Sequence, residues 1–371
     1  MKLLFWLSIL ITFYAYLLYP IWLFLRARLY PRPVSRRPIF PKISIVLAVR
    51  NEAEHLGEKL QNLRELDYPR ELLDTLVVSD GSTDQTNDIL HKVVDPRLRS
   101  ILLPTHGGKA EALNRAVEAA QGDIIVFMDA RQRVAIDSIK MLVESFADPA
   151  VGCVSGALML GDGQDSSARG VGSYWRMEKL IRHWESIGGS VVGATGALYA
   201  VRRSLVPRLP TGTILDDVLI PMEVARRGAR VIFEPRAQAW DSLPSNPKQE
   251  FRRKVRTLFG NYQLLRIAPW LLTAADPLRF EFISHKLFRL AVPFAFIGII
   301  LSSVFLSGLI YLIPLAAAVG VGTLGALALA RVPLGIVSRL THLALAFVLL
   351  NTAAIVAFFY FAMGKKQVWV R

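Results

Sequence analysis

The chain has apolar runs near both ends and an alternating pattern between them. Residues 3–25 carry no charge, and a helix of that length crosses a hydrocarbon core of about 30 Å. Three further apolar runs cover residues 287–309, 310–330 and 342–362. We therefore expect about four transmembrane helices, one N-terminal and three C-terminal. A cleaved signal peptide has a shorter apolar core and a small-residue cleavage site, so we expect the first run to persist as an anchor.

In the middle of the chain, short apolar stretches alternate with stretches at helical spacing. Strands are expected at residues 43–49, 73–80, 99–104 and 123–129, and helices at 54–66, 83–94 and 109–120. This alternation is typical of an α/β fold with a mainly parallel sheet. In such sheets ligands bind beyond the carboxyl ends of the strands. The polar residues that follow the expected strands are therefore candidates for a site.

Three groups of polar residues occupy such positions: Arg50, Asn51 and Glu52; Asp80, Gly81, Ser82 and Thr83; and Asp129. The second group also has a structural interpretation, because Ser and Thr cap helices well and Gly suits a tight turn. Two positions after Asp129, where a second acid would complete an obvious metal site, the chain has Arg131.

Charged residues at expected helix starts indicate an anionic ligand. Lys109 opens a helix, where a cation is unfavourable unless an anion such as phosphate is bound there. Asp216 and Asp217 also stand at an expected helix start, which the helix dipole alone would favour. Arg253 and Arg256 are three residues apart and share one helix face. That face could bind an anion or contact lipid headgroups.

Composition and charge favour a membrane protein over a nucleic-acid-binding one. The chain of 371 residues is 53% hydrophobic and has a mean hydropathy of +0.37. Its net charge is +14, but much of the excess flanks the apolar runs, where anionic lipid attracts it. Basic residues concentrate after the first run, so the middle of the chain should face the cytoplasm. The single cysteine, Cys153, excludes an internal disulfide and is expected to pack in the core.

The sequence does not decide on which side of the membrane the chain ends. With the middle of the chain inside, three C-terminal crossings place the basic end outside, against the charge rule. Residues 331–341 could instead form an interfacial or re-entrant helix.

Taken in order, the motifs "AVRNEAE", "SDGSTD", "DAR", "LDD" and "RKVRT" resemble those of an inverting family 2 glycosyltransferase. The resemblance covers residues 43–265. The chain is similar to membrane-bound bacterial members of the family that make exopolysaccharides. Relatives of this type include cellulose, hyaluronan and poly-N-acetylglucosamine synthases. It implies a GT-A nucleotide-sugar-binding fold, with a mixed sheet and helices on both faces.

The implied organisation has five parts. These are an N-terminal transmembrane helix (1–27), a basic proline-rich linker (28–42), a cytoplasmic GT-A domain (43–262), interfacial helices (263–286) and a C-terminal transmembrane region (287–371). The implied location is the inner membrane of the cell, with several crossings. A helix expected at 172–186 approaches the acceptor in relatives, although ordinary aromatic packing would also explain its pattern.

The resemblance also implies roles for individual residues. Asp217 would be the general base, with Asp216 as its neighbour in the sugar-nucleotide site. Asp80 would receive the base or ribose of the nucleotide, and Asp129 would bind a metal. The remaining contacts to the donor would come from Arg50, Glu52, Lys109, Arg253 and Arg256.

Two departures from the family pattern change what is expected. Arg131 replaces the second acid of the D-x-D motif, and it cannot bind a cation. Either Asp129 alone holds Mg²⁺ or Mn²⁺ through the diphosphate and waters, or Arg131 neutralises phosphate itself, or the site is inactive. Thr257 replaces the aromatic residue of Q-x-x-R-W, so we expect addition of one or a few sugars.

The predicted function is inverting sugar transfer from a nucleoside-diphosphate sugar, by resemblance a UDP-sugar, to a saccharide or lipid-linked acceptor. Its setting would be exopolysaccharide or glycolipid synthesis at the cytoplasmic membrane face. Expected partners are the donor, the acceptor, the bilayer and components of a synthase complex, with no nucleic acid. Two alternatives remain. One is transfer to a membrane lipid of the polyprenyl phosphate, ceramide or diacylglycerol type; the other is a non-catalytic sugar-nucleotide-binding subunit.

Overall fold

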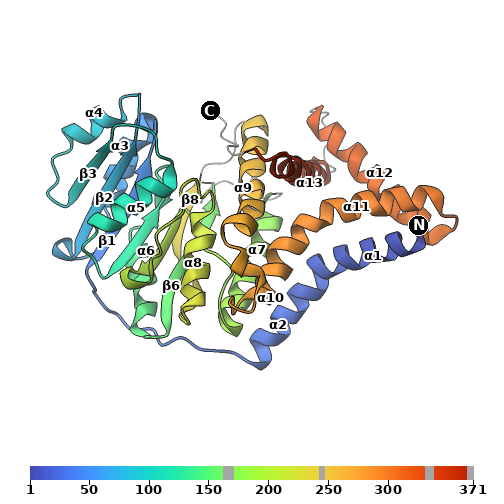
Figure 1. Cartoon of the computed structure of the whole chain (residues 1–371), viewed down its shortest axis with the longest axis horizontal. Helices are drawn as coiled ribbons and strands as arrows, with labels where there is room; N and C mark the ends of the chain where they lie inside the picture. The colour runs from blue at the N-terminus through green and yellow to red at the C-terminus, as the bar shows by residue number, and fades with distance from the viewer. Residues whose placement is uncertain (162–170, 242–246, 331–337, 366–371) are drawn as a thin grey trace.

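The computed structural model describes residues 1–161, 171–241, 247–330 and 338–365. It has a sheet-containing part on one side and long apolar helices on the other (Figure 1). Much of the segment 331–341, for which an interfacial or re-entrant helix is one alternative, lies outside the described residues. The end of the chain does so as well.

Within the described residues, eight strands form one sheet in the order β3-β2-β1-β4-β7-β6-β8-β5. Their bounds are β1 Ile43–Val49, β2 Leu73–Asp80, β3 Leu98–Leu103, β4 Ile124–Met128, β5 Arg133–Val134, β6 Val151–Leu160, β7 Leu198–Arg202 and β8 Arg230–Asp241. The first four strands pair in parallel, whereas β7 runs antiparallel to both β4 and β6. The predicted mixed sheet is confirmed.

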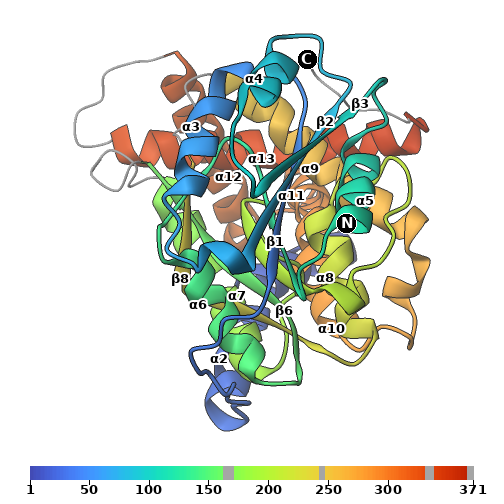
Figure 2. The ribbon, with the colours of Figure 1, turned by 90° about the vertical axis from the view of Figure 1, so that its left-hand side faces the viewer.

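Helices cover both faces of the sheet because side chains alternate along each strand. Ile43, Ile45 and Leu47 pack beneath α3 (Ala53–Arg64), α4 (Thr86–Lys92) and α6 (Ser138–Val143). On the other face lie α5 (Lys109–Ala119), α8 (Asp216–Arg226) and α9 (Pro247–Ile267). Figure 2 shows α3 and α6 on one side of the strands, with α5 and α8 on the other. The core therefore has two layers that meet at the strands.

The expected elements agree closely with the structure, apart from the start of one helix. The strands expected at 43–49 and 73–80 have those bounds. The helix expected from residue 83 begins at Thr86. Asp84 is used in the preceding loop, where its two carboxylate oxygens accept the backbone N–H of Thr86 at 3.0 Å and of Ala53 at 3.1 Å. These bonds hold the loop in a non-helical shape.

In the described part of the chain, four helices are long and apolar enough to cross a membrane: Lys2–Leu29, Arg279–Phe305, Leu309–Leu329 and Leu343–Ala362. The N-terminal one comprises α1 (Lys2–Phe13), a π turn (Tyr14–Leu18) and α2 (Tyr19–Leu29). The others comprise α10 (Arg279–Phe282), a π turn (Ile283–Leu287) and α11 (Phe288–Phe305), then α12 (Leu309–Leu329) and α13 (Ser338–Ala362). One span is N-terminal and three are C-terminal, as predicted.

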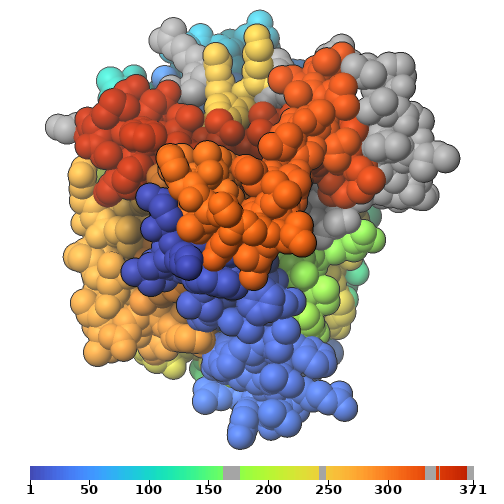
Figure 3. Space-filling view, turned by 90° about the vertical axis from the view of Figure 1, so that its right-hand side faces the viewer, coloured from blue at the N-terminus to red at the C-terminus, as the bar shows by residue number. Residues whose placement is uncertain are grey.

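The apolar helices pack on each other and on the sheet-containing part. The N-terminal helix (blue) lies beside α11 (orange) on the face shown in Figure 3, and α1 contacts α11. The last helix, α13, packs along α9. Ala353 and Ala357 of α13 belong to the same buried cluster as Phe127 of β4 and Val218 of α8. The apolar helices therefore help to form the core on one face of the sheet.

Candidate active site

Several of the predicted site residues lie at the carboxyl ends of the parallel strands or at the helix that follows. Asp80 ends β2, Asp129 follows β4, and Lys109 begins α5. The loop after β1 is tied to the loop after β2, because Asn51 Oδ1 accepts the backbone N–H of Thr83 at 2.8 Å. Asn51 has a φ of 51°, a left-handed conformation that asparagine tolerates better than most residues. The carboxyl-end edge of the sheet is thus formed by the ends of the parallel strands and by two loops that are hydrogen-bonded to each other.

Lys109 joins two acids from different elements. Its Nζ lies 3.0 Å from Oδ1 of Asp129 and 3.1 Å from Oδ1 of Asp216, at the start of α8. Burial alone would lower the pKa of Lys109, but Asp129, Asp216 and Asp217 together raise it above its usual value. The lysine is therefore held as a cation at the positive end of a helix. This agrees with the sequence-based expectation of an anion-binding position.

Asp217 and Asp129 approach each other across Gly196. The backbone N–H of Gly196 donates to Oδ2 of Asp217 at 3.1 Å. A Cβ added to Gly196 would lie 3.3 Å from Oδ2 of Asp129 and 3.4 Å from Oδ2 of Asp217. A side chain there would fill the space between the two acids. The glycine therefore keeps open the place where a substrate could contact both.

The environment of Asp217 suits a proton acceptor. The pKa of this carboxyl is raised to about 6, mainly by burial and then by the charge of Asp216, while Lys109 lowers it. Asp129 adds to the increase, and Lys286 opposes it. A carboxylate with a pKa near the working pH is a better general base than an ordinary surface acid.

Asp80, at the end of β2, is largely engaged by the loop that leads from β3 into α5. Its Oδ1 accepts the N–H of Gly107 at 2.7 Å, and its Oδ2 accepts that of Gly108 at 3.0 Å. The Nδ1 atom of His106 also lies 2.7 Å from Oδ2. The side chain is 3% exposed, so it orders the turn that leads into Lys109. Its predicted contact with the nucleotide stays a prediction.

Arg131 pairs with another predicted site residue. Its Nε lies 3.2 Å from Oε1 of Glu52, and Nη2 lies 3.2 Å from the same oxygen. This pair bridges the loops after β1 and β4. Arg50 is exposed at the end of β1. Arg131 is therefore paired with Glu52 of the first-strand loop.

The two arginines of "RKVRT" lie on α9, as predicted. Arg253 donates to Oδ2 of Asp241 at 3.1 Å, and its Nε lies 2.9 Å from Oε2 of Glu250. Arg256 is half-buried on the same helix. Arg253 is thus oriented by two acids, one at the end of β8 and one within its own helix.

Comparison with known proteins indicates the class of reaction. Residues 44–209 match the model of glycosyl transferase family 2. The chain contains a family 2 glycosyltransferase domain. A poly-β-1,6-N-acetyl-D-glucosamine synthase of Staphylococcus aureus is 26% identical over 231 residues, which are 60% of this chain and 55% of that protein. The probable glycosyltransferase YdaM of Bacillus subtilis is 25% identical over 235 residues, with the same coverage. The chain thus matches about half the length of these curated relatives.

One solved structure resembles this glycosyltransferase over nearly its whole length. It is the mannosyltransferase PcManGT from Pyrobaculum calidifontis in complex with GDP-Man and Mn²⁺. It is 25% identical, has a TM-score of 0.74, and the match covers 98% of this chain and 99% of that one. The matched part therefore includes both the sheet-containing part and the apolar helices of this chain. The predicted fold and the assignment as a glycosyltransferase are confirmed.

The site of this glycosyltransferase fits a divalent metal that takes few protein ligands. No group of three or more His, Cys, Asp or Glu side chains suited to a metal occurs in the part of the chain that the structure describes. The side chain of Asp129 is 39% exposed, and its Oδ1 accepts a hydrogen bond from Lys109 Nζ at 3.0 Å. One carboxylate, with phosphate oxygens and water, is enough for Mg²⁺. A divalent metal is thus compatible with these residues.

Sequence reasoning missed three residues of this region. The first is His106, which holds Asp80. The Tyr199 hydroxyl donates to Oδ2 of Asp216 at 3.3 Å. Burial lowers the pKa of Lys59 to about 8, and its Nζ donates to the carbonyl of Gln132 at 2.8 Å. A signal for Lys59 was present, because it stands among the buried leucines of α3.

Proposed function

We propose that this protein transfers a sugar, with inversion, from a nucleoside-diphosphate sugar to a hydroxyl of a saccharide or lipid-linked acceptor. The observation that carries the proposal is the convergence of Lys109, Asp129 and Asp217 at one edge of the sheet. An anion-binding cation and a carboxylate with a raised pKa then lie within one site. Inverting transfer requires these two functions on opposite sides of the sugar.

In the proposed reaction, Asp217 accepts the proton of the acceptor hydroxyl as its oxygen attacks the anomeric carbon. The bond from that carbon to the diphosphate breaks, and its electron pair leaves with the nucleoside diphosphate. A single in-line displacement inverts the anomeric configuration. Asp217 is oriented by the Gly196 amide, and Asp216 is held by Lys109 and Tyr199.

Negative charge builds on the departing diphosphate and must be neutralised. Lys109 supplies one positive charge at the start of α5. Asp129 would hold a divalent metal, Mg²⁺ or Mn²⁺, which supplies further charge neutralisation when bound. Arg253 and Arg256 on α9, together with Arg50 and Glu52 beyond β1, are proposed to border the nucleotide diphosphate.

The donor and the setting follow from the relatives by analogy. UDP is the nucleotide that the sequence resemblance favours, and Asp80 is proposed to receive its base or ribose. The structure that matches at full length contains GDP-Man, so both nucleotides must be tested. The four apolar helices support a location in the cell membrane. The basic residues after the first helix support a cytoplasmic catalytic domain.

A donor screen tests the proposal. Purified full-length protein is mixed with membrane lipid extract, β-linked oligosaccharides and a panel that includes UDP-GlcNAc and GDP-mannose. Release of nucleoside diphosphate is followed with Mg²⁺, with Mn²⁺ and with chelator. We expect one donor to give product of inverted configuration by NMR. The Asp217→Asn variant should lose about 10²-fold or more in kcat, the usual contribution of a general base.

The matched control is Glu223→Gln, a partly buried acid of the same helix that pairs with Arg226. Like Asp217→Asn, this variant replaces a carboxylate by an amide, but it lies outside the site. It should therefore keep normal activity. Retention of full activity by Asp217→Asn, or a product of retained configuration, would refute the mechanism.

A further inference from the structure

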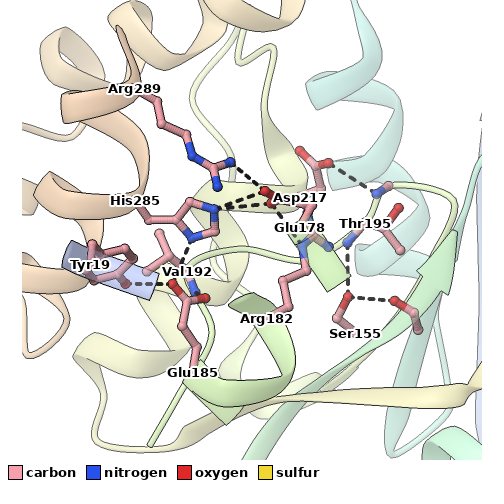
Figure 4. A network of polar contacts seen from close by, with 12 residues as sticks. Tyr19, Ser155, Glu178, Arg182, Glu185, Val192, Thr195, Asp217, His285 and Arg289 are labelled. Carbon is pink, nitrogen blue, oxygen red and sulfur yellow. Dashed lines mark hydrogen bonds and ion pairs between the residues drawn. The ribbon is translucent and has the colours of Figure 1, made fainter. Parts of the chain in front are cut away.

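A second polar cluster lies outside the residues assigned above, between the catalytic part and the apolar helices. It joins α2, α7 (Val171–Gly188), the π turn Ile283–Leu287 and the start of α11. Its members are Tyr19, Glu178, Arg182, Glu185, His285 and Arg289, and Figure 4 labels them together with Asp217. We name these six residues the junction cluster. Its position indicates that it connects the membrane helices to the site.

His285 lies between two buried acids. Its Nδ1 is 2.7 Å from Oε1 of Glu185, and its Nε2 is 3.2 Å from Oε1 of Glu178. The exposed fractions are 1% for His285 and Glu185 and 7% for Glu178. A histidine can donate from both ring nitrogens only as the imidazolium. That form places a positive charge between the two carboxylates.

The acids of the junction cluster are held in their charged form. Burial alone would raise the pKa of Glu178, but Arg289 and His285 hold it well below its usual range. Burial likewise opposes charge on Glu185, and His285 and Tyr19 lower its pKa. Both oxygens of Glu178 are used, since Arg289 Nη1 donates to Oε2 and Arg182 Nε donates to Oε1 at 3.4 Å. Charges buried in this way impose a defined geometry on the groups around them.

The cluster continues to the loop that orients Asp217. Oε2 of Glu185 accepts the backbone N–H of Val192 at 3.4 Å, at one end of the 190–196 loop. At the other end, the N–H of Ala194 donates to the carbonyl of Asp217 at 2.6 Å. Two residues later, Gly196 donates to the carboxylate of Asp217. Glu185 and Asp217 therefore hold the two ends of one short loop.

We propose that His285 and Glu185 are positioning residues, which fix the 190–196 loop so that the Gly196 amide stays against Asp217. Tyr19 of the N-terminal helix takes part, because its hydroxyl donates to Oε1 of Glu185 at 2.8 Å. The orientation of the Asp217 carboxylate then depends on how the membrane helices pack against the catalytic part. This inference rests on the proposed role of Asp217.

Two tyrosines on the N-terminal helix provide a matched test. Tyr14 and Tyr19 each make one hydroxyl contact to another element. The Tyr14 hydroxyl lies 2.7 Å from Ser284 Oγ, next to His285, whereas the Tyr19 hydroxyl contacts Glu185 itself. We measure kcat, KM for the donor and the pH profile of Tyr19→Phe and Tyr14→Phe, in full-length protein reconstituted in lipid.

Tyr19→Phe is expected to lower kcat about tenfold, the equivalent of one hydrogen bond lost from the transition state. The KM for the donor should change little. A weaker Gly196 contact leaves the Asp217 carboxylate less stabilised, so the acidic limb of the pH profile should move to higher pH. The charged neighbours of Asp217, which are Asp216, Asp129, Lys109 and Lys286, are unchanged in both variants. Tyr14→Phe should match the wild type.

A second set of variants separates positioning from folding. Glu185→Gln and His285→Gln are compared with the double variant, which removes both charges together. Coupled residues are non-additive, so the double variant should lose less than the product of the two single losses. Binding of the nucleoside diphosphate, measured by calorimetry, should remain normal in all three, since the donor-binding residues are distant in the chain and unchanged.

The outcomes distinguish this inference from the proposed function. If Asp217→Asn is inactive while Tyr19→Phe behaves like Tyr14→Phe, the positioning role is wrong and the proposed base stands. Multiplicative losses in the glutamine variants would overturn it as well. If Asp217→Asn is fully active, the proposed function fails, and the positioning role fails with it.

Discussion

Lys109 begins a helix and Asp129 follows a strand, yet their charged atoms lie 3.0 Å apart. The same ammonium lies 3.1 Å from Asp216. A single cation therefore spans the two groups of acids that the sequence placed at separate element ends. Because three acids surround this lysine, it also sets the charge that Asp217 experiences.

The first prediction concerns the pH dependence of this pair. Asp217 must be deprotonated to act as a base, so kcat/KM should fall as the pH drops through about 6. Lys109 lowers the pKa of Asp217, so Lys109→Met should move the acidic limb to higher pH. Asp216 raises that pKa, so Asp216→Asn should move the limb to lower pH. Shifts in the same direction for both variants would contradict this electrostatic account.

The second prediction concerns the space between the acids. Gly196→Val would place a side chain within about 3.4 Å of both Asp129 and Asp217. We expect a loss of about 10²-fold in kcat, because small displacements of reacting groups have effects of that size. Gly57→Ala is the control, since a Cβ at Gly57 meets nothing within 4 Å and the residue is on an exposed helix face. That change should stabilise the helix by roughly 0.5–1 kcal/mol without altering the rate. Equal rates for the two variants would argue against this description of the site.

The third prediction addresses the replacement of the second acid by Arg131. Arg131→Asp adds a carboxylate two residues from Asp129, and activity should then reach its maximum at a lower concentration of Mn²⁺. The substitution also removes the ion pair with Glu52. The Arg131 side chain is more than half exposed, so the free energy of unfolding should change by less than about 1 kcal/mol. Arg131→Gln serves as the comparison because it breaks the ion pair without adding a ligand. An unchanged metal titration in Arg131→Asp would indicate that position 131 lies away from any bound cation.

The fourth prediction concerns product length. Thr257 takes the place of an aromatic residue in the related motif, and its hydroxyl donates to the carbonyl of Arg253 at 3.1 Å. An exposed threonine offers no flat apolar surface to a growing sugar chain. With radiolabelled donor, the protein alone should add one or a few sugars. Long polymer in that assay would show that processive synthesis does not need an aromatic residue here.

Much of the sheet was predictable because its strands are local apolar runs with clear ends. The run from Ile43 to Val49 is followed by Arg50 and Glu52, so both the strand and its polar edge are visible in the sequence. Since parallel strands place their carboxyl ends on one edge, Asp80 and Asp129 could be expected near each other. The antiparallel pairing of β7 with β4 was not visible, because no local pattern specifies which distant strand is the neighbour.

Contacts between distant residues were the least predictable part of the site. Arg131 and Glu52 are 79 residues apart, and His285 and Glu178 are 107 apart. Nothing in the spacing near either residue indicates its partner. His285 looks unremarkable in the sequence, a lone histidine at the edge of an apolar run, until the fold places it between two carboxylates.

The alanines of α13 that enter the core beside Phe127 and Val218 affect how this enzyme can be handled. Its aqueous and bilayer-facing portions share side-chain packing, so the water–lipid boundary does not divide the molecule into independently folding pieces. Trimming the final helix should expose the face of α9 that α13 covers and lower the melting temperature of what remains. Detergents that loosen helix packing should likewise inactivate the protein before its secondary structure is lost.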